Sequence, residues 1–275
     1  GSFAAGLLQC WVDGTQSKFL HPGWAAQSGI TAATLGKNNT TGPLEVIEGR
    51  FGLLASHLQD ETIELDYEML VKDLGSHWES ENASFKPFPV AHVIHPYIDA
   101  LLRLKTQHTL KAENIKRIVC PVPEYQVGIV CEPAHEKHRP NSDSHGRVSL
   151  QFTLAEAMVK GVINKDSYSA QALADEEILT LAKKVEYVVD DSFPGPEQFK
   201  GEVTIELESG ERYTEIEDYN RGSRQNPMTE EEITEKFTTN SAELLSSIQQ
   251  QSLKEKILSL ESMTSAAEFI PFTFG

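Results

Sequence analysis

Two prolines within three residues, in the segment Phe85-Lys86-Pro87-Phe88-Pro89, constrain the fold of this chain more than any other feature. Proline lacks a backbone N–H and clashes with the preceding helical turn, so this segment must be extended or a loop. The residues before it have a helical character, with many small residues between positions 25 and 33 and helical apolar spacing over 67–74. The residues after it show a mixture of helical and strand-like patterns. We therefore predict a structural boundary between residues 80 and 85.

Beyond this boundary the sequence predicts both helices and strands. Apolar residues at helical spacing indicate helices near 94–105, 150–158 and 175–183, and Asp175 is a suitable N-cap for the last of them. Alternating apolar residues indicate strands over 115–120, 185–189, 203–207 and 211–218, with the last two joined at Ser209-Gly210 as a hairpin. The polar side chains of Thr204, Glu206 and Glu208 predict that one face of this sheet meets water.

The polar region over 132–146 is expected to be a loop, and a helical segment closes the chain. Thr229 and Glu232 fit a capping box at the start of that segment. The order of helices, then mixed structure, then helices predicts an α+β fold with a small antiparallel sheet.

The charge of the chain limits its partners. Forty-one acidic residues against 24 basic ones give a net charge of −17, which disfavours nucleic acid and anionic membranes as partners. The sequence contains no apolar run long enough to cross a bilayer. Three cysteines without C-x-x-C spacing (Cys10, Cys120 and Cys131) indicate buried free thiols in a reducing compartment. We expect the cytoplasm, or the mitochondrion if a transit peptide precedes this sequence in a eukaryote.

Lys18 and His21 form the first candidate site. They precede Pro22, which suits the first turn of a helix, and the free N–H groups of a helix N-terminus favour an anion. A cation and an imidazole at such a position predict a carboxylate site. The alternative is that both side chains are solvated surface residues.

Several familiar site motifs do not occur in the sequence, among them G-x-G-x-x-G, G-x-x-x-x-G-K-[ST], G-x-S-x-G and H-E-x-x-H. The histidines His135, His138 and His145 lie near Glu132 and Glu136, but their spacing matches no standard metal site. A solvated loop is the simpler interpretation, and a metal-binding regulator is the alternative.

Ordered motifs along the chain resemble those of the 2-methylcitrate dehydratase (MmgE/PrpD) family, which includes cis-aconitate decarboxylases and iminodisuccinate epimerase. The matching motifs are Asp13-Gly14 followed by Lys18-x-Leu20-His21-x-Gly23-x-Ala25-Ala26, Thr41-Gly42-Pro43, Glu48-Gly49-x-x-Gly52, Lys86-Pro87-Phe88-Pro89, His95-x-x-Ile98-Asp99-Ala100, Arg139-Pro140, Ser149-Leu150-Gln151-Phe152 and Asn226-Pro227-Met228-Thr229. The resemblance implies a homodimer in which an all-helical domain carries an α+β lid. Residues 1–80 would end the helical domain, 85–225 would form the lid, and 226–275 would return to the helical domain. The family's first helical segment has no counterpart here, so the resemblance places this chain as the C-terminal portion of a family member with part of the active site.

The resemblance also implies the chemistry. Family members act on small di- and tricarboxylates without a metal or another cofactor, in a pocket between the two domains. Lys18 and Lys86 match active-site lysines, His95 matches a recurrent histidine, and Phe152 stands where a tyrosine is expected at the substrate. Lys18 and Lys86 would bind carboxylates and stabilise enolate-like charge, while His21 or His95 would carry protons. The expected activity is dehydration of 2-methylcitrate or a related 2-hydroxy acid. Decarboxylation of cis-aconitate, epimerisation, and a catalytically incomplete paralogue that serves as a dimerisation module are the alternatives.

Overall fold

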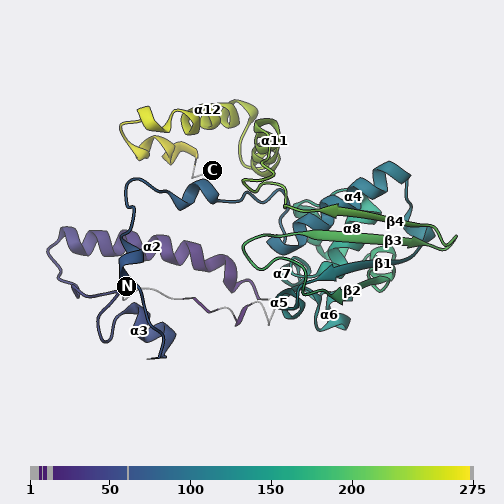
Figure 1. The fold of residues 1–275 in the computed structure, drawn as a ribbon. Helices are drawn as coiled ribbons and strands as arrows, with labels where there is room; N and C mark the ends of the chain where they lie inside the picture. Colours follow the sequence, from purple (N-terminus) through teal and green to yellow (C-terminus); the bar gives the residue numbers. More distant parts are fainter. Residues whose placement is uncertain (1–5, 8, 11–14, 61, 273–275) are drawn as a thin grey trace. The chain divides into compact units, whose positions relative to one another are not determined.

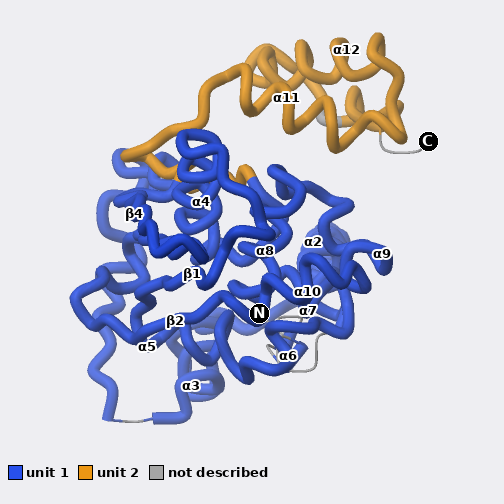
Figure 2. Tube along the Cα trace, turned by 90° about the vertical axis from the view of Figure 1, so that its right-hand side faces the viewer, with its two compact units in different colours: residues 1–83, 88–220 blue, residues 84–87, 221–275 orange. Residues whose placement is uncertain are grey.

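The computed structural model describes residues 6–7, 9–10, 15–60 and 62–272 of the 275-residue chain. Figure 2 colours its two compact units, of which the first comprises residues 1–83 and 88–220 and the second comprises residues 84–87 and 221–275. Asp13-Gly14, which opens the first of the family motifs, lies outside the described residues. None of the described helices combines the length and the apolar character that a membrane span requires.

The N-terminal part of the first unit is helical, as predicted. Its elements are α2 (Ser17–Lys37), α3 (Leu53–Leu58), η1 (Tyr67–Leu70) and η2 (Glu79–Asn82). The helical spacing over residues 67–74 yields only the single 3-10 turn of η1, followed by hydrogen-bonded turns that end near Gly75, whose φ is +83°.

The predicted start of α2 is wrong. The helix begins at Ser17 and contains Pro22, so Lys18 and His21 lie inside it rather than before it. Pro22 cannot donate the backbone hydrogen bond that an ordinary residue would give to the Lys18 carbonyl. The helix nevertheless continues through this position, which shows that proline alone did not mark its first turn.

The sheet lies in residues 115–217 and has four strands in the order β2-β1-β3-β4 (Figure 1). The strands are β1 (Ile115–Val122), β2 (Val185–Val189), β3 (Gly201–Leu207) and β4 (Arg212–Glu217). The β1–β3 and β3–β4 pairs are antiparallel, but β1 and β2 are parallel with Ile118 opposite Val185. The sheet is therefore mixed and not purely antiparallel as predicted, because the helices between β1 and β2 form the long crossover that parallel pairing needs.

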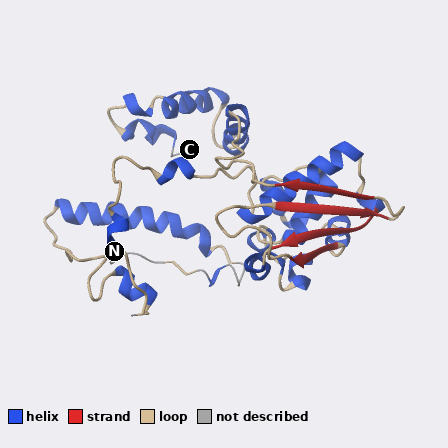
Figure 3. Cartoon of the chain, in the orientation of Figure 1, coloured by secondary structure: helices blue, strands red, loops and turns tan. Residues whose placement is uncertain are grey.

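Helices cover one face of this sheet, as Figure 3 shows. The helix α4 (His95–His108) packs on β3 and β4, while α8 (Leu150–Lys160) packs on α4, on β2 and on α10 (Glu176–Ala182). Together they enclose a hydrophobic core that includes Ile98, Leu101 and Leu154. The predicted helices are confirmed here, and Asp175 caps α10 by accepting from the Glu177 N–H.

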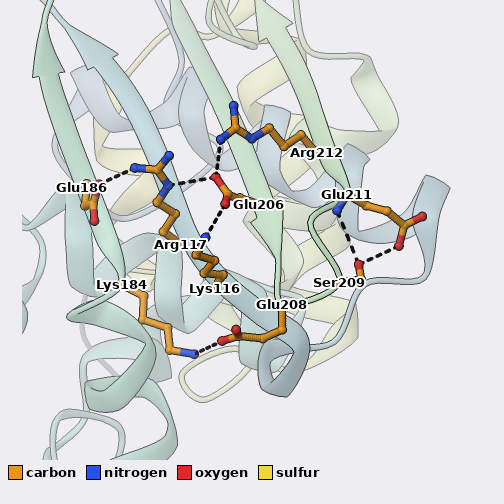
Figure 4. A network of polar contacts seen from close by, with 9 residues as sticks. All are labelled: Lys116, Arg117, Lys184, Glu186, Glu206, Glu208, Ser209, Glu211 and Arg212. Carbon is orange, nitrogen blue, oxygen red and sulfur yellow. Dashed lines mark hydrogen bonds and ion pairs between the residues drawn. The ribbon is translucent and has the colours of Figure 1, made fainter.

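The opposite face of the sheet is polar, as predicted, but it contains a buried carboxylate. Glu206 is 6% exposed because Lys116, Arg117 and Arg212 converge on its carboxylate at 2.7–3.0 Å (Figure 4). Arg117 also lies 3.5 Å from Glu186 on β2. This network therefore includes residues of all four strands, with Glu206 of β3 at its centre.

Short helical turns connect the main elements of this unit. The region over 132–146, predicted as a loop, contains α6 (Ala134–His138) and α7 (Asp143–Gly146), and Ser142 caps α7. Such single turns are too short to give a periodic apolar pattern in the sequence. The others are η3 (His92–Ile94), η4 (Ala112–Asn114), α5 (Glu124–Gln126), the π-helical η5 (Val127–Cys131), η6 (Lys165–Tyr168) and α9 (Ala170–Leu173).

The second unit contains α11 (Glu230–Ser241), α12 (Ser247–Leu258), η7 (Leu260–Ser262) and η8 (Ala266–Phe272). The capping box predicted for Thr229 and Glu232 is confirmed at the start of α11. A second capping box, formed by Ser246 and Gln249, starts α12. Local side-chain chemistry thus sets where both helices begin.

Candidate functional site

Two histidine rings meet where α4 begins. His92 starts the short turn η3 and His95 starts α4, with Pro96 in the first helical turn, where proline is well tolerated. The centroids of the two rings are 4.9 Å apart. Because His95 and the following residues are buried, this turn brings two imidazoles together at the edge of the core.

Aromatic rings and one amide surround this histidine pair. His95 is fully buried against the ring of Phe88 at 5.4 Å, and His92 lies 5.1 Å from the ring of Phe199. The side-chain amide of Asn220 donates to Nε2 of His92 at 2.9 Å. This bond leaves the proton of a neutral His92 ring on Nδ1, so that the orientation and the tautomer are set together.

Asn220 is itself held in place. It is 5% exposed, and its backbone N–H donates to the Phe199 carbonyl at 3.1 Å. The amide and the aromatic ring that contact His92 are therefore fixed to each other. A partly exposed imidazole oriented by a buried amide beside a second imidazole is an arrangement suited to proton transfer.

Lys86 lies in the second unit, in the segment 84–87, which forms neither helix nor strand. Its side chain is exposed, and its backbone is fixed on both sides. The Phe85 N–H donates to the Gly222 carbonyl at 2.9 Å, and the Lys236 amine donates to the Lys86 carbonyl. A lysine on a restrained backbone presents its charge with less conformational freedom, as a carboxylate-binding residue needs.

Lys18 and His21 share a surface of α2, since residues three apart on a helix are neighbours. Lys18 is exposed and His21 is partly buried, with its ring close to Gly6. Lys18 and His21 thus lie on one helix, His95 at the start of another, and Lys86 in the other unit. A pocket that joins these four residues stays a prediction.

Phe152 lies in the core of the first unit. Its ring is fully buried near Tyr168 at 6.1 Å, and its backbone N–H donates to the Ser149 side chain that caps α8. This position explains the phenylalanine as a packing residue. Contact between Phe152 and a substrate also stays a prediction.

The histidines at 135, 138 and 145 do not form a metal-binding cluster. His135 is largely exposed, whereas His145 is buried, and both rings lie more than 3.5 Å from the nearest oxygen of Glu136. Within the part of the chain that the structure describes, no group of three or more His, Cys, Asp and Glu side chains is placed to hold a metal ion.

His92 is the residue of this histidine pair that sequence reasoning did not predict. The available signal was the spacing His92-x-x-His95, which places two imidazoles one helical turn apart. Its partner Asn220 lies 128 positions away in the sequence, so no local pattern could reveal that hydrogen bond.

Two models of one protein family match this chain. The MmgE/PrpD C-terminal domain model matches residues 88–262, and the MmgE/PrpD N-terminal domain model matches residues 1–66. The chain is 27% identical over 241 residues to cis-aconitate decarboxylase of Mus musculus, and this alignment covers 84% of the chain and 47% of the relative. It is 27% identical over 259 residues to cis-aconitate decarboxylase of Homo sapiens, covering 90% of the chain and 51% of the relative.

A cis-aconitate decarboxylase-like protein of Aspergillus oryzae is 23% identical over 285 residues, which cover 99% of the chain and 58% of the relative. The chain thus spans about half the length of the curated relatives that it matches. The C-terminal domain model alone extends over more than half of the chain and includes the histidine pair, the whole sheet and the helices that cover it. The chain therefore belongs to the MmgE/PrpD family.

Proposed function

We propose that this chain supplies the proton-transfer part of a lyase active site for small di- or tricarboxylates. The observation that carries the proposal is the pair of imidazoles at the start of α4, with His92 oriented by Asn220. Imidazole titrates near neutral pH and can both take up and deliver a proton. Lys86, and Lys18 on α2, would bind substrate carboxylates and stabilise negative charge that develops beside them.

Two related reactions fit this chemistry. In decarboxylation of cis-aconitate, the bond between carbon and a carboxylate breaks, CO2 leaves, and the electron pair remains on carbon until an acid protonates it. In dehydration of 2-methylcitrate, a base removes a proton next to a carboxylate and the hydroxyl leaves as water after it is protonated. Both reactions need a proton carrier and cations near the developing charge. The relatives named cis-aconitate decarboxylases favour cis-aconitate as the first substrate to test.

Turnover by the purified 275-residue chain, alone and mixed with the remaining part of a family member, tests this proposal. Substrate loss and product formation are followed by NMR with cis-aconitate and, separately, with 2-methylcitrate. We expect His92→Asn and His95→Asn each to lower kcat by about 100-fold, because general acid–base groups contribute at least that much. His108→Asn is the matched control, since His108 lies at the other end of α4 and stacks on Tyr213.

The outcomes separate the hypotheses. Turnover of neither substrate by the wild-type chain, either alone or mixed with the remaining part of a family member, would refute the lyase proposal and would favour the dimerisation module. Turnover that survives both histidine substitutions would show that the proton carriers lie elsewhere, for example at His21.

A further inference from the structure

The segment that leads into the histidine pair has no regular structure of its own. Residues 88–91 form neither helix nor strand, although Phe88 and Val90 are buried. Such a segment needs tertiary contacts to fix its course, because it lacks the repeating hydrogen bonds of a helix. The positions of the His92 and His95 rings therefore depend on what holds residues 88–91.

Arg147 holds this segment at two points. Its Nη1 donates to the Pro89 carbonyl at 2.8 Å, and its own carbonyl accepts from the Ala91 N–H at 2.8 Å. One residue thus binds the backbone on both sides of Val90. The second of these bonds ends one residue before His92.

Arg147 is in turn anchored to the core. Its guanidinium carbon lies 5.0 Å from the centre of the Tyr168 ring, and Nη2 lies 3.4 Å from the Asp143 carboxylate. The Tyr168 hydroxyl is hydrogen-bonded to Thr153 of α8 at 3.0 Å. These contacts connect α8, through Arg147, to the segment that leads into the histidines.

The chain on the other side of Arg147 is fixed as well. The buried Lys137 donates to the Val148 carbonyl at 2.8 Å and to the Ile129 carbonyl at 2.9 Å. The Ser149 hydroxyl donates to the Lys137 carbonyl at 2.6 Å. Because Val148 and Ser149 cannot shift freely, the backbone of Arg147 is a firm support for residues 89–91.

We propose that Arg147 is a positioning residue that sets the geometry of His92 and His95. This inference rests on the proposed function, in which those imidazoles transfer protons. The planar guanidinium can contact a carbonyl, a carboxylate and an aromatic face at once, which a lysine ammonium cannot do. Arginine is therefore the residue type that this junction requires.

Steady-state kinetics of the 275-residue chain, assayed as for the proposed function, give the first test. We expect Arg147→Met to lower kcat by about 10- to 100-fold, because small displacements of reacting groups have effects of that size. KM should change less, since the side chain binds protein groups rather than a substrate carboxylate. Arg147→Lys should recover part of the rate. Arg212→Met is the matched control, because Arg212 is one of three cations around Glu206 on the other face of the sheet.

The nitrogen-15 NMR signals of the His92 ring give a second test that needs no substrate. The bond from Asn220 holds Nε2 as an acceptor in the wild type, so Arg147→Met should shift this signal toward the average of the two tautomers, and Arg212→Met should leave it in place. If Arg147→Met does not fold, the His92 signals of Arg147→Lys are compared with those of the wild type instead, since lysine keeps one donor and the aliphatic stem.

The two tests distinguish the proposals from each other. Unchanged His92 signals and an unchanged kcat in a destabilised Arg147→Met protein would show that Arg147 is merely structural. A wild-type protein without turnover, even when mixed with the remaining part of a family member, whose His92 signals still respond to Arg147→Met, would refute the proposed function and leave the positioning role in place. A shifted signal together with a lower kcat would support both.

Discussion

At the scale of single residues, Glu206 shows how one carboxylate can link several strands. Lys116, Arg117 and Arg212 surround it, and hydrogen bonds from the first two lower its pKa from the usual value of 4.5 to about 2 (Figure 4). A carboxylate whose pKa is lowered by folding stabilises the fold above its unfolded pKa, and this contribution is lost as the pH falls. We therefore expect the contribution of Glu206 to be complete above pH 4.5 and to fade between pH 4.5 and about 2.

Glu206→Gln tests this expectation. The substitution leaves three cations around a neutral amide, so the free energy of unfolding at pH 7 should fall relative to the wild type. The difference should shrink as the pH approaches 2, because the wild-type carboxyl is then protonated as well. Urea unfolding at several pH values measures it. Glu208→Gln is the control, since Glu208 is exposed and lies 3.7 Å from its partner Lys184. A difference that does not depend on pH would contradict the assignment.

Single residues also show what the sequence could reveal about the site. Lys86 and His95 were predicted as site residues because they lie in short motifs that can be compared directly. His92 was not predicted because its ring is oriented by Asn220 and Phe199, which contact it from distant parts of the chain. A hydrogen bond over such a distance depends on the whole sheet and leaves no local signature.

At the scale of elements, the turn at Gly222 controls the Lys86 segment within the second unit. Gly222 has a φ of +94°, and a Cβ at this position would lie 2.2 Å from the Phe85 carbonyl oxygen. Its own carbonyl accepts from the Phe85 N–H, and its N–H donates to the Asn226 carbonyl at 2.7 Å. Only glycine combines this backbone conformation with such a close approach.

Gly222→Ala should therefore displace Phe85 and Lys86 as well as strain the backbone. We expect a rise in KM for the carboxylate substrate, measured by steady-state kinetics. Gly210→Ala is a matched control, because Gly210 has a similar φ of +90° but no atom within 4 Å of an added Cβ. The same rise in KM in both variants would mean that backbone strain alone is responsible and would contradict a role for the Phe85 contact.

Elements differ in how far the sequence predicts them. Asp175 and Thr229 cap helices through their own side chains, and α4 and α8 show clear periodicity, so these elements were predicted correctly. The pairing of β1 with β2 was not, because alternation identifies a strand but not its neighbour. The start of α2 was also misplaced, since proline is compatible with a first turn but does not prove one.

At the scale of the whole molecule, the hydrophobic core formed by the described residues lies within residues 88–220. Thirty apolar residues form this core, and all of them lie between Phe88 and Ile205. Among the described residues of α2 and α11, by contrast, only Ser28 is buried. Leu244, Ile248 and Leu258 are 70–82% exposed. Since apolar burial is the main favourable term in folding, residues 88–220 should provide nearly all of the stability of this chain.

A polypeptide of residues 88–220 should consequently fold by itself in one cooperative transition. At about 0.7 kcal/mol per residue near 60 °C, its calorimetric unfolding enthalpy should be roughly 90 kcal/mol. The full-length chain should give nearly the same enthalpy, because its other segments bury little apolar surface. In hydrogen exchange of the full-length chain, amides of α4, α8 and β3 should be protected far longer than those of α2 and α12. An enthalpy for the full-length chain about twice that of the 88–220 polypeptide would show instead that the helical segments at both ends form cooperative structure of their own.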